Sequence, residues 1–316
     1  MRQIFDSMRF LVGNREILER MENVRALPLF SDKALHFFDC LSKRLMQSGE
    51  AKKYPDVIAY AFWVRRTSLE RVRNQYKSNA QKMGRGIAFQ IAPSNIPVQF
   101  AVSMTYALTA GNASIVRISD KKFEQTDIIC RAVQSVLEDC CPEIVPYICV
   151  VRYPHSDETT QILTKMCDIR MIWGGNKTIA DIRKAVINAR CIDLGFADRY
   201  SMAVFNSDDY LKKDAMAVAE DFYNDTYFSD QNACSSPRLI VWMGSKISEA
   251  KKRFWGVLER VVSEKYRMDP ICSSDKLLKT AVCSAEHPGI REVKKSNLLV
   301  RIELPSLYDD IMDHKG

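Results

Sequence analysis

Apolar residues recur at three- and four-residue intervals in two early segments, residues 34–46 and 57–76. This spacing places them on one face of a helix, so both segments are predicted to be amphipathic helices. The first 80 residues are therefore expected to be helical. The pattern changes at Gly84, where short apolar runs bounded by glycine and proline begin, which is typical of buried strands.

Beyond Gly84, strand-like apolar runs alternate with stretches of helical periodicity. Such alternation predicts βαβ units, a parallel sheet with helices on both faces, and ligand binding at the carboxyl ends of the strands. The expected strands cover residues 86–92, 114–118, 147–152, 168–173 and 191–194, and the expected helices cover residues 98–109, 124–137, 158–165 and 177–188.

A second α/β section begins near Ser201. We therefore expect two domains, residues 1–200 and 201–316. In the second section the expected strands cover residues 201–205, 238–242 and 298–303, and the expected helices cover residues 209–223 and 246–265.

The composition is that of an ordinary globular chain, with 316 residues, 47% hydrophobic and 27% charged. No apolar run reaches the roughly 18 residues that a membrane span requires, and the N-terminus lacks the pattern of a signal peptide. A cytoplasmic location is expected. The net charge of +7 is spread along the chain without a block of like charges, which favours a solvated surface over a nucleic-acid patch. It would also suit a polyphosphate ligand such as NADP or coenzyme A.

The chain has ten cysteines, and in a cytoplasmic protein these are expected to be free thiols and not disulfides. The sequence has no CxxC pair, the four histidines are scattered, and Cys140 and Cys141 are adjacent without a histidine nearby in the sequence. No metal site is therefore expected from linear spacing.

The usual nucleotide-binding fingerprints are missing. Gly84 and Gly86 precede their strand and lack the third glycine of GxGxxG, and there is no Walker A motif. A dinucleotide enzyme of the ordinary Rossmann type is disfavoured, although the βαβ alternation persists.

Five short segments, in order and at fitting spacing, resemble motifs of the aldehyde dehydrogenase superfamily, which binds NAD(P) without that fingerprint. The segments are Ala-Pro-Ser-Asn-Ile-Pro at 92–97, Ala-Gly-Asn-Ala-Ser-Ile-Val-Arg at 110–117, Ile-Trp-Gly-Gly at 172–175, Asp-Leu-Gly at 193–195 and Gln-Asn-Ala-Cys at 231–234.

Within that superfamily, Pro-Ser-Asn-Ile-Pro together with Gln-Asn-Ala-Cys-Ser-Ser-Pro-Arg most resembles the LuxC-type acyl-CoA reductases. The resemblance implies an aldehyde-dehydrogenase-like α/β fold, with an NAD(P)-binding domain within residues 1–200 and a catalytic domain at 201–316. It implies reduction of a fatty acyl-CoA or acyl-protein thioester to an aldehyde, usually with NADPH. It further implies an acyl-protein synthetase partner and a homo-oligomer.

Members of this family normally continue for several tens of residues beyond the point where this chain stops. The resemblance therefore leads us to expect an incomplete catalytic domain, impaired in oligomerisation. A non-catalytic form that binds nucleotide or a synthetase partner is the alternative.

The resemblance implies that Cys234 is the nucleophile, and that the Asn95 amide and the Cys234 backbone N–H stabilise the oxyanion. The alternatives are a small core residue for Cys234 and a turn residue for Asn95. Asp193 stands where the superfamily usually has the glutamate that activates water. A thioester reductase needs no such water, so Asp193 is compatible with catalysis, or it caps a strand end. Its presence weighs against aldehyde oxidation as the reaction.

For the cofactor, the resemblance implies contacts from Pro93, Ser94 and Ser119, and a ribose contact from Arg117. Asp120 matches an acidic residue of NAD-preferring members, whereas the two lysines that follow it would attract a 2′-phosphate. These features conflict, and NADP is favoured from the family.

Two further cofactor contacts are expected later in the chain. Gly174 and Gly175 would let the backbone approach the pyrophosphate. Glu292 is the nearest match to a glutamate that binds the nicotinamide ribose, and an exposed glutamate at a helix end is its alternative.

Overall fold

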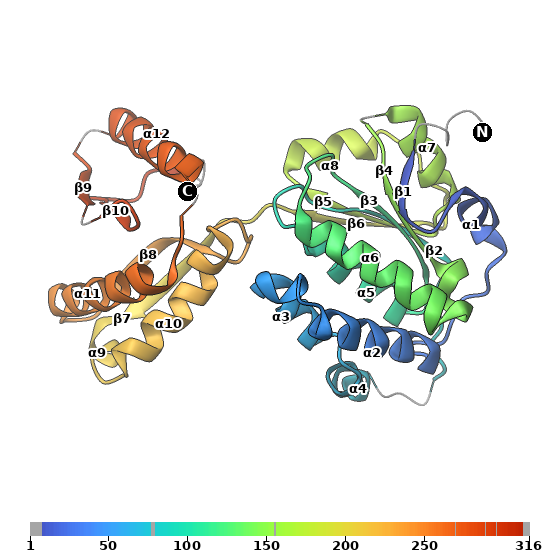
Figure 1. Cartoon of the computed structure of the whole chain (residues 1–316). Helices are drawn as coiled ribbons and strands as arrows, with labels where there is room; N and C mark the ends of the chain where they lie inside the picture. Colours follow the sequence, from blue (N-terminus) through green and yellow to red (C-terminus); the bar gives the residue numbers. More distant parts are fainter. Residues whose placement is uncertain are drawn as a thin grey trace. The chain divides into compact units, whose positions relative to one another are not determined.

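The computed structural model describes residues 8–76, 80–154, 156–268, 270–287, 289–294 and 296–311. The chain divides into two compact units, Met1–Asp198 and Arg199–Gly316 (Figure 1).

A six-stranded sheet forms the centre of the first unit, with the strand order β1-β4-β3-β2-β5-β6. β1 runs antiparallel to β4 and the other neighbouring pairs are parallel, which confirms the predicted parallel sheet. The chain passes from β2 to β3 and β4 and then returns to place β5 on the other side of β2. The strands are β1 (Arg9–Val12), β2 (Ile87–Ile91), β3 (Ala113–Ile118), β4 (Ile148–Arg152), β5 (Ile169–Gly174) and β6 (Ile192–Ala197).

Helices cover both faces of this sheet (Figure 1). Residues of α2, α3, α5 and α6 share one hydrophobic core, and residues of α1, α7 and α8 share the other. The helices of this unit are α1 (Arg15–Arg20), η2 (Met21–Asn23), α2 (Asp32–Gln47), η3 (Ala51–Lys53), α3 (Pro55–Trp63), α4 (Arg66–Gln75), α5 (Gln99–Thr109), α6 (Glu124–Asp139), η4 (Pro142–Tyr147), α7 (Asp157–Met166) and α8 (Asn176–Arg183).

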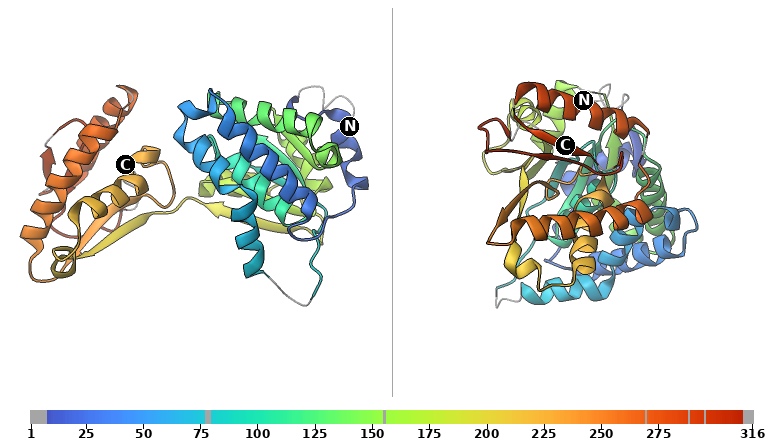
Figure 2. Two further views of the ribbon diagram at one scale, coloured as in Figure 1. Left: turned by 60° about the horizontal axis from the view of Figure 1, so that its bottom comes forward. Right: turned by 90° about the vertical axis from the view of Figure 1, so that its left-hand side faces the viewer.

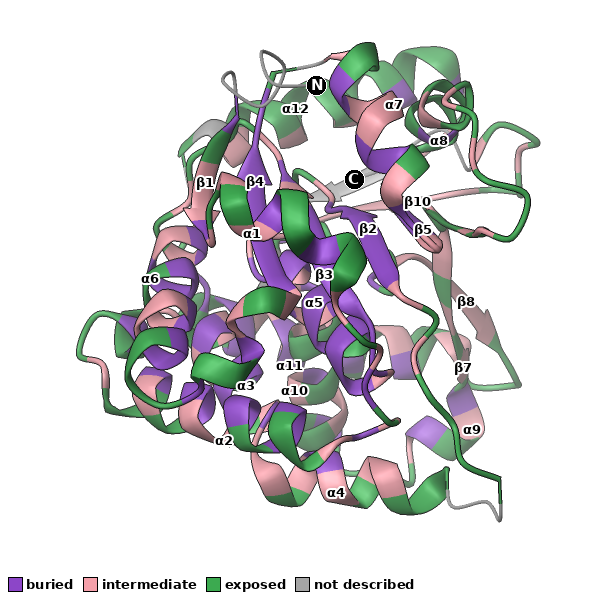
Figure 3. Cartoon of the chain, turned by 90° about the vertical axis from the view of Figure 1, so that its right-hand side faces the viewer, coloured by how far each residue is buried: buried purple, intermediate pink, exposed green. Residues whose placement is uncertain are grey.

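The central strands β2, β3 and β4 are buried on both faces, as Figure 3 shows, whereas the edge strand β6 is largely exposed. Successive side chains of a strand point to opposite faces. On β3, Ile115 packs in the core of α1, α7 and α8, whereas Val116 packs in the core of α2, α3, α5 and α6. On β4, Val151 and Val150 divide between the two cores in the same way. The continuous apolar runs of these strands follow from this double burial.

The second unit contains a parallel pair of strands and an antiparallel pair. Its core is aromatic: Phe254 is fully buried, and the rings of Phe205, Tyr210, Phe222 and Trp242 lie within 6.0 Å of its ring, centroid to centroid. Figure 2 shows the two strand pairs of this unit with their helices. The elements are β7 (Ser201–Asn206), α9 (Ser207–Tyr210), α10 (Ala215–Asp225), η5 (Tyr227–Ser229), β8 (Pro237–Met243), α11 (Ile247–Lys265), α12 (Pro270–Glu286), β9 (Arg291–Lys294) and β10 (Val300–Glu303).

Some sequence predictions of secondary structure were wrong. Residues 9–12, expected to be helical, form β1, which pairs with β4 at the edge of the sheet. The segment is too short for its hydrophobic period to distinguish a strand from a helix. The helix expected at 57–76 is broken at Arg65, whose backbone is extended (φ −57°, ψ 146°). The hydrophobic period hides this break, since Val57 and Leu69 on its two sides enter the same core.

The second unit also departs from the prediction. The helix expected at 209–223 is two helices, α9 and α10, and Asp214 caps the second by accepting a hydrogen bond from the Met216 N–H. α12 and β9 were not predicted.

Among the described residues, no helix is both long and apolar enough to cross a membrane.

Candidate active site

The loop after β2 carries Pro93, Ser94 and Asn95 at the carboxyl edge of the sheet. The first residue of the loop is still hydrogen-bonded to β3, since the Ala92 N–H donates to the Arg117 carbonyl at 2.9 Å. Ser94 and Asn95 are exposed, while Pro93 is half-buried. Asn95 is therefore open to solvent on this loop.

This loop and the loop after β5 flank the point where the strand order reverses. In open α/β sheets, ligands bind outside the carboxyl ends of the strands at such a point. β2 is the strand from which the chain turns to one side through β3 and to the other through β5. Asn95 follows β2, and Gly174 ends β5. The fold thus brings two of the predicted segments to one edge.

A small hollow separates the loop after β2 from the loop after β3. Pro93, Ser119 and Lys121 line it, together with apolar residues that include Ile118. The structure therefore brings the predicted contacts Pro93 and Ser119 to one hollow. Asp120 is exposed beside them, and Lys121 is the basic residue that reaches the hollow.

Arg117 lies away from this hollow. Because side chains alternate along β3, it occupies the other face of the sheet from Ile118, which lines the hollow. Its guanidinium lies 5.4 Å from the centroid of the Tyr153 ring, and Nη2 donates to the Tyr153 carbonyl at 3.4 Å. The predicted contact Ser119 therefore lines the hollow, whereas the predicted contact Arg117 does not.

Gly174 and Gly175 connect β5 to α8. A side chain on Gly174 would bring its Cβ within 3.1 Å of the Thr178 side chain, whereas no atom lies within 4 Å of a Cβ built on Gly175. Gly175 is the N-cap of α8, so no side chain shields the first backbone N–H groups of this helix. Free N–H groups at a helix start are suited to a phosphate.

The residue before these glycines is held firmly. The Trp173 indole stacks on Phe196 of β6 at a centroid distance of 4.0 Å, and its Nε1 donates to the Ser103 hydroxyl at 3.2 Å. Ser103 lies on α5, so this contact ties the end of β5 to the helix that follows the Asn95 loop.

Asp193 lies near the start of β6, opposite Arg170 of β5. Its two carboxylate oxygens accept hydrogen bonds from Arg170 Nε at 2.9 Å and from Arg183 Nε at 2.8 Å. Burial opposes ionisation here, yet these two arginines hold the pKa of Asp193 below its ordinary value. Both oxygens are occupied by cations, which favours a structural role over a catalytic one.

Cys234 lies in the loop between η5 and β8 of the second unit, and it is exposed. Asp230 and Gln231 begin the loop with left-handed backbones, at φ 51° and 55°. The Ser201 hydroxyl donates to the Cys234 carbonyl at 2.8 Å, which fixes the Cys234 segment to the start of β7.

Further hydrogen bonds brace the same loop. Gln231 Nε2 donates to the Pro237 carbonyl at 3.3 Å, and the Tyr266 hydroxyl donates to Asp230 at 2.6 Å. Cys234 is therefore an accessible thiol on an ordered loop, not a small core residue. The predicted nucleophile belongs to the second unit, and Asn95 belongs to the first.

Glu292 lies in β9, where it pairs with Ile302 of β10. The alternative of a glutamate at a helix end is therefore wrong, since α12 ends at Glu286. The side chain of Glu292 lies outside the described part of the structure.

Linear spacing missed one group of residues with possible ligand chemistry. His36, Cys40 and Cys141 converge on the α2 side of the first unit. The four-residue spacing of His36 and Cys40 on a predicted helix was the available signal, but nothing in the sequence pointed to Cys141 as their neighbour.

A family model described as acyl-CoA reductase (LuxC) matches residues 13–267. A long-chain acyl-protein thioester reductase of Aliivibrio fischeri is 23% identical over 166 residues, which cover 52% of this chain and 33% of that protein. The match thus spans about a third of the length of this curated relative.

Solved aldehyde dehydrogenases resemble the fold. An NAD-dependent aldehyde dehydrogenase from Sinorhizobium meliloti matches with a TM-score of 0.62 and 12% identity, over 87% of this chain and 58% of that one. A glyceraldehyde-3-phosphate dehydrogenase from Methanocaldococcus jannaschii, complexed with NADP, matches with a TM-score of 0.61 and 13% identity, over 96% of this chain and 71% of that one. These likenesses confirm the predicted aldehyde-dehydrogenase-like fold.

Proposed function

The chain belongs to the acyl-CoA reductase (LuxC) family, and from this premise we propose that it reduces a fatty acyl thioester to the aldehyde. The observation that carries the proposal is the accessible Cys234 thiol on a braced loop inside the matched region. A nicotinamide cofactor is the proposed reductant, with NADPH preferred over NADH. The thioester donor is a fatty acyl-CoA or an acyl-protein.

The proposed reaction has two steps at Cys234. The thiolate attacks the thioester carbonyl, a new C–S bond forms, and the carrier thiol leaves with the proton that Cys234 gave up. NADPH, when bound, supplies the hydride that reduces the enzyme-bound thioester. The thiohemiacetal on Cys234 then gains a proton on oxygen and collapses, which releases the aldehyde and restores the thiol.

Asn95 is the proposed oxyanion donor, together with the Cys234 backbone N–H. Both steps place negative charge on the former carbonyl oxygen, so fixed donors at that position lower both barriers. The exposed position of Asn95 at the strand-order reversal supports this role.

Two observations support the proposed binding of NADP. The open space at Gly175 and the N-terminus of α8 suit a pyrophosphate, and Lys121 beside Pro93 and Ser119 suits a 2′-phosphate. Ser94 and Asp120 are exposed near this hollow and are proposed as further contacts. Arg117 and Glu292 are also proposed as cofactor contacts, on the family resemblance alone.

Asp193 is proposed to be structural, because its two oxygens are engaged by Arg170 and Arg183. A carboxylate held in this way does not activate water, which disfavours oxidation of an aldehyde to an acid. We further propose an acyl-protein synthetase as partner and a homo-oligomer as the working form, both from the family. Residues up to 198 are proposed to bind the cofactor, and those from 199 to carry the nucleophile.

Intact-protein mass spectrometry after mixing the chain with a long-chain acyl-CoA tests the proposal. We expect a single acyl adduct that disappears when NADPH is added, with aldehyde as the product. Cys234→Ala should form no adduct. Cys140→Ala is the matched control, since Cys140 and Cys234 are the exposed cysteines among the described residues.

An equal adduct on Cys234→Ala would refute the nucleophile assignment. If folded wild-type chain forms no adduct with either an acyl-CoA or an acyl-protein donor, the chain instead binds nucleotide or a partner without turnover.

A further inference from the structure

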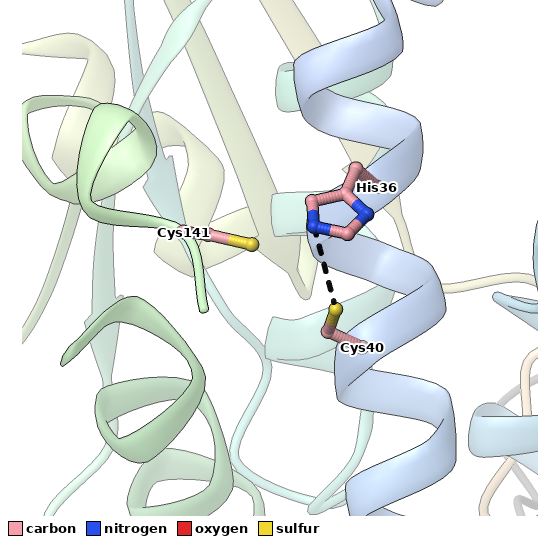
Figure 4. Close-up of side chains that lie close together, drawn as sticks. All are labelled: His36, Cys40 and Cys141. Atoms are coloured by element: carbon pink, nitrogen blue, oxygen red, sulfur yellow. Dashed lines mark hydrogen bonds between the residues drawn. The ribbon is translucent and has the colours of Figure 1, made fainter. Parts of the chain in front are cut away.

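Three ligand-type side chains converge from two distant parts of the first unit. His36 and Cys40 lie one turn apart on α2, and Cys141 lies at the start of η4, just after α6. One ligand atom from each of the three lies within 4.8 Å of the other two. Figure 4 shows Cys141 directed from its turn toward the two side chains on the helix.

The spacing of these atoms is close to that of a metal shell. His36 Nε2 lies 3.8 Å from Cys40 Sγ. A tetrahedral zinc ion with Zn–S near 2.3 Å and Zn–N near 2.0–2.1 Å separates its ligand atoms by about 3.5–3.8 Å. Small side-chain rotations, of about 1 Å at the ligand atoms, would bring all three onto one ion.

The backbone that carries Cys141 is ordered. The N–H groups of Cys140 and Cys141 both donate to the Val136 carbonyl at 3.0 Å, which fixes the end of α6. Arg44 of α2 also donates to Asp139 of α6 at 3.0 Å, so the two helices are held side by side near this group. The three ligands therefore come from elements with a fixed mutual position.

Exposure increases across the group in a way that suits an ion arriving from solvent. Cys141 is fully buried, Cys40 is half-buried and His36 is exposed. Cys140, next to Cys141 in the chain, is also exposed, so a third cysteine lies beside the group.

A redox switch suits these residues less well. Thiols that respond to oxidants have a low pKa and are accessible. Here Cys141 is fully buried and Cys40 is half-buried, so neither thiol is freely accessible to an oxidant.

We propose that His36, Cys40 and Cys141 form a binding site for a thiophilic metal ion of the zinc class. Imidazole and thiolate are the ligand types that such ions prefer. On binding, each thiol releases its proton to solvent and the sulfur becomes a ligand. The ion would link α2 to the junction of α6 and η4, so its role is to stabilise the first unit. The site is separate from the proposed reductase chemistry.

The test uses the full chain, stripped of metal with a chelator and kept reduced with a phosphine. Titration with Co²⁺ should give one equivalent with a sulfur-to-cobalt charge-transfer band and tetrahedral visible bands. Zn²⁺ should displace it stoichiometrically, and it should raise the thermal unfolding temperature of the wild-type chain by mass action.

His36→Ala and Cys40→Ser are the decisive variants, because both positions lie on the accessible side of α2 and leave the buried Cys141 in place. Loss of an outer-shell partner alone lowers metal affinity by about 10–100-fold, so loss of a direct ligand should weaken Zn²⁺ binding by at least about 100-fold. Both variants should keep their circular dichroism spectrum and lose the stabilisation by Zn²⁺.

Cys191→Ser is the matched control. Cys167 and Cys191 form another close thiol pair of the first unit, with sulfur atoms 3.8 Å apart, and this variant should bind Zn²⁺ like the wild type. Absence of Co²⁺ and Zn²⁺ binding by the reduced chain would overturn the proposal. Unchanged binding in His36→Ala and Cys40→Ser would overturn it equally.

Discussion

Arg170 and Asp193 face each other across the neighbouring strands β5 and β6, and Arg170 Nε donates to Asp193 Oδ1 at 2.9 Å. The Arg170 side chain is 2% exposed, and its Nη1 also donates to the Ala185 carbonyl at 2.7 Å. A residue that the resemblance predicted to be catalytic is thus part of a buried ion pair. Asp193 is therefore assigned to the structure of the sheet, and the proposed chemistry is assigned to Cys234.

Asp193→Asn should lower the free energy of unfolding by about 3 kcal/mol, because it leaves the buried Arg170 without its counter-charge. Arg183→Gln is the control, and it should cost less than about 1 kcal/mol because that side chain is 49% exposed. Urea unfolding followed by circular dichroism measures both. If folded Asp193→Asn lost acyl transfer while keeping wild-type stability, Asp193 would be catalytic instead.

The same ion pair should make stability depend on pH. The pKa of Asp193 is lower in the folded chain than the ordinary value of about 3.9, so its contribution is fully present above that value. The contribution is lost as the pH falls through the folded-state pKa. The stability gap between wild type and Asp193→Asn should therefore be constant from about pH 5 to 8 and shrink below about pH 4. A gap that persists at acid pH would contradict the assignment.

Asn95→Ala should slow formation of the acyl-enzyme by about 10²–10³-fold, since one oxyanion donor is removed. Ser94→Ala, at the neighbouring exposed position, should have a much smaller effect. Rapid-quench mass spectrometry of the Cys234 adduct measures the rate. Equal rates for the two variants would exclude the oxyanion role of Asn95.

Lys121→Ala should raise the KM for NADPH by about 10-fold and leave the KM for NADH nearly unchanged, because a charge-assisted hydrogen bond to the 2′-phosphate is worth about 1.5–3 kcal/mol. Lys122→Ala is the matched control, since Lys122 does not line the hollow. Steady-state kinetics with both cofactors measure the effect. An equal loss with NADPH and NADH would show that Lys121 does not read the phosphate.

Asn112→Ala should destabilise the first unit by about 2–3 kcal/mol. Asn112 is 3% exposed, and its Oδ1 accepts from the Arg85 N–H at 2.7 Å and the Gly86 N–H at 3.3 Å. The substitution leaves the Arg85 and Gly86 N–H groups, just before β2, without their acceptor. Asn188→Ala removes an exposed hydrogen bond and should cost less than about 1 kcal/mol, as measured by urea unfolding. If the two variants lost similar free energies of unfolding, the predicted contribution of the buried Asn112 hydrogen bonds would be wrong.

Hydrophobic periodicity was sufficient for the α/β class and the parallel sheet. The strands around Ile115 and Val150 are buried on both faces, and such strands leave continuous apolar runs in any sequence. The motif order then placed Asn95 and Gly174 at strand ends, and the structure puts both at the reversal of strand order.

Periodicity was not sufficient where long-range pairing or backbone geometry decided the outcome. β1 forms only because β4 offers it an edge, and the break at Arg65 leaves the apolar period intact. The same limit applies to side chains. The hollow at Lys121, the opposite face taken by Arg117 and the arginines around Asp193 depend on which strands become neighbours.

The sequence by itself determined the fold class, the order of the motifs and the identity of Cys234 as the thiol to test, because these depend on local pattern. The tertiary structure alone decided that Asp193 is held by two arginines and that Cys141 meets His36 and Cys40. These contacts join residues from 10 to about a hundred positions apart and leave no periodic trace, since the packing that creates them is set by the whole sheet and its helices.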